Sequence, residues 1–191
     1  MINFRLFSIL LITIFPAMQS GAATAAQAPV SAGSRIATTE NYVAQKINEI
    51  RADHGLAPLG ISGKLRTAAR RQSTDMAANN FLAHVDSQGN DLRARLAKVG
   101  ATGWSTVGEN VGQSMGYRNN SDVIIEGWMK SPHHRDNILN GSFVSTGIGA
   151  AVAPDGTLYL TQVFMESGGK TAKAAEYPYK TPRKSSRKRA E

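Results

Sequence analysis

The sequence has no cysteine among its 191 residues. This absence excludes disulfide bonds, zinc sites built on thiolates, thiol nucleophiles and the acylated cysteine of a bacterial lipoprotein. The sequence also has no apolar run of about 20 residues, the length that a membrane-spanning helix needs. No H-E-x-x-H pair is present either, so no short local motif indicates a metalloprotease.

The first 25 residues have the pattern of a secretory signal peptide. Arg5 precedes an apolar run over 6–18, and small residues in A-x-A patterns follow over 23–28. We therefore expect residues 1–25 to direct export, with the mature protein secreted or periplasmic. An uncleaved anchor is the alternative, although the apolar run is short for it. An exported protein without disulfides suits a bacterium better than a eukaryote.

The net charge of +8 is concentrated at the C-terminus. Residues 170–191 hold eight Lys or Arg and two Glu, whereas residues 40–169 hold twelve of each sign and are neutral. The basic character therefore belongs to the tail, and we expect no specific nucleic-acid partner for the domain. The tail, 169–191, is predicted to be basic and disordered. Its functional alternative is attachment to anionic envelope polymers or lipid head groups through residues 170–191.

The remaining chain predicts a linker over 26–38 and one domain over 39–168. Within the domain, Val43, Ile47 and Ile50 give a helix over 40–53 one apolar face. The other predicted elements are helices over 62–80 and 92–99, an extended stretch over 104–115, helices capped by Ser121 and started by Ser131-Pro132, and a β-hairpin over 145–166 that turns at 154–156. Helices followed by a terminal hairpin indicate an α+β layered fold.

Glu109 and His134 have local settings that favour a functional role. Glu109 lies in an apolar, glycine-rich extended stretch, and alternation places it on the same face as Val107 and Val111. A buried carboxylate there needs a histidine, an arginine or a metal as partner. His134 lies in the first turn of a helix, where the helix dipole favours a neutral imidazole. His133 is about 100° further around that helix, so we expect one of the two to point inward.

His84 follows the second helix in a loop and, taken alone, is more typical of a solvated or satisfied histidine. His84, Glu109 and His134 are far apart in the sequence, and no spacing rule joins them. From the residues alone, their convergence is a hypothesis.

Four segments in order resemble the bacterial branch of the CAP superfamily, the cysteine-rich secretory, antigen 5 and pathogenesis-related proteins with SCP-like domains. They are FLAH (81–84), GENVGQS (108–114), EGWMKSPHHRDNIL (126–139) and GIGAAVAPDGTLYLTQVF (147–164). The resemblance extends over about 40–165. It implies a three-layer α-β-α sandwich around a small antiparallel sheet.

The resemblance also implies a central cavity lined by two histidines and acidic residues, which in some members binds zinc or another divalent metal. Carried over by motif, these residues are His84, Glu109 and His134. Animal and plant members have a further glutamate where this chain has Ser131, so the implied site is His-Glu-His. Such a set can hold zinc with an open position for water, or form a metal-free cluster in which Glu109 orients a histidine.

The function predicted from these features is an exported binding module with a His-Glu-His cavity that can hold a divalent metal. One alternative is a zinc-assisted hydrolase, in which Glu109 is a third ligand or the general base. The other is a carrier of a lipid, a sterol or another small hydrophobic ligand. A carrier requires an apolar groove distinct from the histidine cavity.

Overall fold

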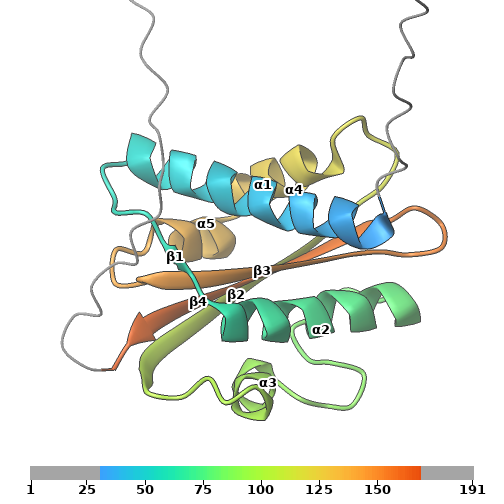
Figure 1. Ribbon diagram of the computed structural model, residues 1–191. Helices are drawn as coiled ribbons and strands as arrows, with labels where there is room; N and C mark the ends of the chain where they lie inside the picture. Colours follow the sequence, from blue (N-terminus) through green and yellow to red (C-terminus); the bar gives the residue numbers. More distant parts are fainter. Residues whose placement is uncertain (1–30, 169–191) are drawn as a thin grey trace, which may run out of the picture.

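A computed structural model describes residues 31–168, which form three layers around a central sheet (Figure 1). One face of the sheet is covered by α1 (Ala32–Asp53), α4 (Asn120–Lys130) and α5 (Pro132–Leu139), and the other by α2 (Gly63–Asn79) and α3 (Leu92–Lys98). This arrangement confirms the predicted α+β sandwich. No helix within residues 31–168 is long and apolar enough to cross a membrane.

The sheet has four strands in the order β1-β3-β4-β2. The strands are β1 (Gly60–Ile61), β2 (Trp104–Ser114), β3 (Ser145–Val152) and β4 (Leu158–Ser167). The three long strands are antiparallel, which confirms the predicted hairpin and extended stretch, whereas β1 adds one short parallel pairing to β3. Two residues carry no detectable periodicity, so β1 was not predicted. The strand that bears Glu109, β2, is an edge strand.

Alternation along β4 divides the core between the two faces of the sheet. Leu160 and Phe164 pack into the cluster formed with α1 and α4. Val163 packs against α2 and α3, and Tyr159 packs with Met76 of α2. Both faces of the sheet are therefore buried beneath helices.

The backbones of α2 and β3 approach each other without side chains between them. A Cβ on Gly147 would overlap the backbone where Leu65 meets Arg66, and one on Gly149 would overlap Ala69 and Arg70. The Ser73 hydroxyl donates a hydrogen bond to the Gly149 carbonyl at 3.0 Å, across the same contact. These two glycines therefore fix how closely α2 lies on the sheet.

The first helix is longer than predicted. It begins at Ala32, because the Ser31 hydroxyl caps it by accepting from the Ser34 amide at 3.2 Å, and Ile36 packs against the core. The prediction of a start near Glu40 is therefore wrong, and so is the predicted linker over 32–38. Polar, small residues concealed the extra turns, because their pattern does not distinguish a linker from an exposed helix.

The predicted starts of the other helices are correct for some helices and wrong for one. Ser62 caps α2 as predicted. The cap of α4 is Asn119, whose side chain accepts from the Asp122 amide at 3.4 Å, so the prediction of Ser121 is wrong by two residues. Pro132 begins α5 as predicted, although the Ser131 side chain makes no capping hydrogen bond.

Candidate functional site

Glu109 lies at the centre of β2 with its side chain toward α3. Val107 and Val111 pack on the same side of the sheet, as alternation predicts, and the whole residue is only 8% exposed. A carboxylate at this depth requires charged or hydrogen-bonding partners to offset the loss of water.

The main partner of Glu109 is Arg95 of α3, which is 3% exposed. Its Nη2 donates to Glu109 Oε2 at 2.8 Å and to Oε1 at 3.0 Å. The sequence predicts an arginine, a histidine or a metal beside a buried Glu109, but it does not identify Arg95 as that partner. The seven-residue α3 also carries Arg93, and no periodic signal separates the inward arginine from the outward one.

His84 is the second partner of Glu109. Its Nδ1 lies 2.9 Å from Glu109 Oε1, and its backbone carbonyl accepts from Arg95 Nη2 at 2.9 Å. A further hydrogen bond fixes this loop to α2, because Gln72 donates to the Ala83 carbonyl at 2.7 Å. The His84 side chain is 57% exposed, so its ring reaches solvent although its partner, the Glu109 carboxylate, is buried.

His134 approaches from α5, on the other side of the sheet. Its backbone carbonyl accepts from Asn110 Nδ2 at 3.0 Å, and Asn137 Nδ2 donates to Asn110 Oδ1 at 2.9 Å. The ring is half-buried whereas His133 is exposed, which confirms that only one of the pair points inward. Within residues 31–168, the His134 ring makes no hydrogen bond to His84 or Glu109.

The two candidate histidines have opposite electrostatic settings. The hydrogen bond to Glu109 raises the pKa of His84, with burial opposing the shift. Burial lowers the pKa of His134, and the nearby charges of His84 and His133 lower it further. His134 therefore loses its proton more readily than an ordinary histidine, whereas His84 keeps its proton more readily.

A shallow pocket of about 310 Å³ opens over His84 and Glu109. Its other lining residues include the apolar Val85, Leu92 and Val107. His134 is not among the lining residues. The structure thus joins His84 and Glu109 in one pocket and leaves His134 beside it.

The donor set does not fit a three-ligand metal site in this arrangement. Within residues 31–168, no group of three or more His, Cys, Asp or Glu side chains is placed to hold a metal ion. Both carboxylate oxygens of Glu109 already accept hydrogen bonds from Arg95. A metal on Glu109 would have to compete with a buried guanidinium, so zinc binding stays a prediction for titration to decide.

Residues 44–164 match the profile of the CAP family, described as the cysteine-rich secretory protein family. The chain belongs to this family. The CAP domain is 31% identical over 119 residues to the uncharacterized protein YkwD of Bacillus subtilis, a match that includes 62% of this chain and 45% of that one. The chain thus spans less than half the length of this relative.

Solved structures share the fold of this CAP domain. An extracellular protein containing a SCP domain from Bacillus anthracis is 25% identical with a TM-score of 0.62, over 73% of this chain and 45% of that one. An outer surface protein of Borrelia burgdorferi is 17% identical with a TM-score of 0.60, over 66% of this chain and 91% of that one. The second likeness shows the fold alone.

Two predictions from the sequence lie outside the described residues. They are the signal peptide, 1–25, and the basic tail, 169–191 with its envelope contacts through 170–191. Both stay predictions.

In an NMR pH titration, we expect the pKa of the His84 ring to be raised above the ordinary histidine value and that of the His134 ring to be lowered below it. The raised pKa means that the His84–Glu109 bond stabilises the fold fully below the unfolded-state pKa of about 6.5. That contribution is lost as the pH rises through the folded-state value. In Glu109→Gln, the His84 titration should move to lower pH. Equal midpoints for His84 in the two proteins would contradict the role given to Glu109.

Proposed function

We propose that this chain is an exported CAP-domain binding module that recognises its ligand at the pocket over His84 and Glu109. Export is supported by the apolar run over 6–18 and by the likeness to a Bacillus anthracis protein described as extracellular. The observation that supports the binding role is that Glu109 interacts at the same time with Arg95 and with His84.

These two interactions allow Glu109 to orient the imidazole ring of His84. Its oxygens accept from Arg95 and His84, so the carboxylate fixes the imidazole plane and keeps the proton on Nδ1. The Nε2 of His84 makes no hydrogen bond within residues 31–168. It accepts a hydrogen bond when the ring is neutral and donates one when the ring is charged.

The pocket therefore favours a ligand with a hydroxyl or carbonyl oxygen beside an apolar portion. The oxygen would meet His84 Nε2, and the apolar portion would lie against Val85, Leu92 and Val107. A zinc-assisted hydrolase fits less well, because its general base would have to be the carboxylate that Arg95 engages.

Zinc calorimetry tests the metal-free cluster. We expect the full chain to show no stoichiometric zinc binding at micromolar concentration, because Arg95 occupies the carboxylate. The alternative predicts micromolar or tighter binding that is lost in His84→Ala and His134→Ala. It also predicts roughly tenfold weaker binding in Glu109→Gln. That set of results, with all variants folded, would replace the metal-free cluster by a metal site.

A carrier of acyl chains is the second candidate, because the structure has an apolar groove away from the histidines. The groove, of about 870 Å³, lies between the N-terminal half of α1 and α2, beside β3. Ile36, Ala150 and Val152 contribute apolar walls, and Arg35 supplies a cation for a carboxylate head group. A groove apart from the histidines supports the carrier alternative.

Fatty-acid binding, measured with a fluorescent acyl probe, tests the carrier role. We expect Val152→Glu to weaken binding by about tenfold, because it removes apolar contact and repels a carboxylate. Val152 is 55% exposed, so this change should leave the fold intact. The matched control is Val144→Glu, at a 37% exposed valine outside the groove. Equal affinities of the two variants would remove the groove from consideration.

A further inference from the structure

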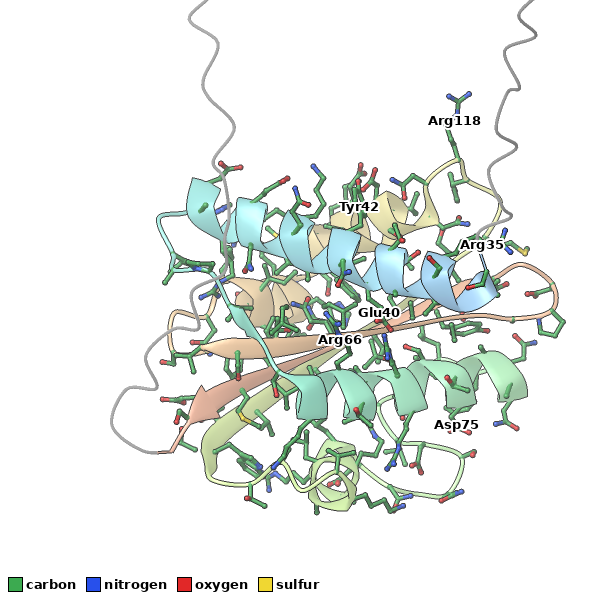
Figure 2. All side chains as sticks on the ribbon, viewed as in Figure 1. Arg35, Glu40, Tyr42, Arg66, Asp75 and Arg118 are labelled. Atoms are coloured by element: carbon green, nitrogen blue, oxygen red, sulfur yellow. The ribbon has the colours of Figure 1, made fainter. Side chains whose placement is uncertain are left out.

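A second polar cavity, of about 360 Å³, lies on the α2–α3 side of the domain. It shares no lining residue with the pocket over His84. Its lining residues come from α2, the loop after it and α3, and they are Arg71, Asp75, Asp86, Ser87, Gln88, Arg95 and Lys98. Figure 2 shows Asp75 on the side of α2 that faces away from α1.

Arg95 connects this cavity to the buried site, and it is incompletely satisfied. Its Nη2 serves Glu109 and the His84 carbonyl, but Nε and Nη1 are buried without a hydrogen-bond partner. A buried guanidinium nitrogen left unpaired is costly, and native proteins usually supply such a donor with protein, water or an ion. The two free nitrogens therefore indicate an acceptor that the protein chain itself does not provide.

The carboxylates that line the cavity are already in use. Asp75 accepts from the amide and the hydroxyl of Ser87 at 2.7 and 2.6 Å. Asp86 accepts from the amide of Gln88 at 3.0 Å and from the amide of Asn90 at 2.7 Å. These bonds fold the loop and leave little acceptor capacity for Arg95.

Within the described residues, the other two cations of the cavity form no direct polar contact, although Lys98 interacts electrostatically with Asp86. Among residues 31–168, neither Arg71 nor Lys98 makes a hydrogen bond or an ion pair, and both are exposed. In the part of the chain that the structure describes, the cavity therefore holds cationic donors without hydrogen-bond partners beside two carboxylates that already accept several hydrogen bonds. A ligand that carries hydrogen-bond acceptors complements these donors.

We propose that this cavity binds a small oxyanion, a phosphate or carboxylate group, between Arg71, Arg95 and Lys98. Charge-assisted hydrogen bonds from arginine and lysine suit such oxygens. Because Nε and Nη1 of Arg95 are buried, the proposal requires the exposed side chains of Gln88 and Lys98 to change rotamer when the anion binds. Asp75 and Asp86 limit the affinity by repulsion, so we expect a dissociation constant on the order of 1 mM. The site is independent of the ligand proposed for the His84 pocket.

Titration of the full chain with inorganic phosphate, followed by arginine side-chain NMR, tests the proposal. Ionic strength is held constant with chloride, so that general screening does not change. We expect the Arg95 Nε–H resonance to shift and saturate. The internal control is Arg51, which is equally buried but whose Nε donates to the Ala57 carbonyl at 3.0 Å. Its resonance should stay in place, and phosphate on the basic tail would not move Arg95.

Matched charge variants complete the test. Arg71→Gln and Lys98→Gln should each weaken phosphate binding at Arg95 by about threefold to tenfold. Arg118→Gln and Lys130→Gln remove the same charges at exposed positions outside the cavity, and they should change the affinity by less than about twofold. Figure 2 shows Arg118 projecting from the opposite end of the domain. The proposal fails if Arg95 does not respond to phosphate, or if the control variants weaken its response equally.

Discussion

Replacing Gly149 by alanine should destabilise the CAP domain by about 3 kcal/mol, the upper end of the roughly 1–3 kcal/mol that overpacking typically costs. The added methyl group would overlap the backbone of Ala69 and Arg70. Backbone atoms of a helix cannot turn aside as a side chain can, so α2 must move off β3. That movement would also break the hydrogen bond from Ser73 to the Gly149 carbonyl.

Urea unfolding measures this effect, and Gly127→Ala is its control. Gly127 lies within α4, and a Cβ there meets no atom within 4 Å. Alanine should therefore stabilise the protein by about 0.5–1 kcal/mol, the usual gain in a helix interior. Similar midpoints for the two variants would show that the α2–β3 contact is not the tight one described.

Replacing Arg95 by methionine should lower the free energy of unfolding by about 3–5 kcal/mol, because it leaves the buried carboxylate of Glu109 without its cation. His84 alone would then hold Glu109, through one exposed ring. The double variant Arg95→Met with Glu109→Gln should recover much of the loss, since no buried charge remains.

Thermal and urea unfolding of the single and double variants gives the coupling energy of the pair. A cost below about 1 kcal/mol for Arg95→Met would mean that water reaches Glu109 and that the pair behaves as a surface ion pair. The same proteins serve the pH titration, because His84 should respond to loss of Glu109 charge and keep its raised pKa only while that charge is present.

The sequence predicted the position of Glu109 well, because strand alternation depends only on its neighbours Val107 and Val111. It also predicted the α2 cap and the hairpin, because a capping serine and the turn residues at 154–156 are likewise local signals. It failed at the start of α1 and at the cap of α4, where several adjacent polar residues are chemically able to cap.

The partner of Glu109 required knowledge of the tertiary structure. Arg95 reaches Glu109 because α3 packs through Leu96 onto α2, a contact that no local pattern in 92–98 reveals. The placement of His134 also depends on packing, since Asn110 and Asn137 fix α5 against the edge strand. The family resemblance named the histidines but gave no role to Arg95 or Asn137.

The short length of β1 bears on whether strands from separate copies of the domain can pair with each other. β1 pairs only with Ser145 and Thr146, so within residues 31–168 the rest of β3 has one edge without a neighbouring strand. Such an edge invites pairing with another chain. Here α1 and α2 flank it, and Glu40, on the side of α1 toward α2 (Figure 2), is buried. Glu40 forms an ion pair with Arg70 of α2, which lies beside this part of β3. We expect this ion pair between the two helices to hinder another strand from pairing with the open edge of β3.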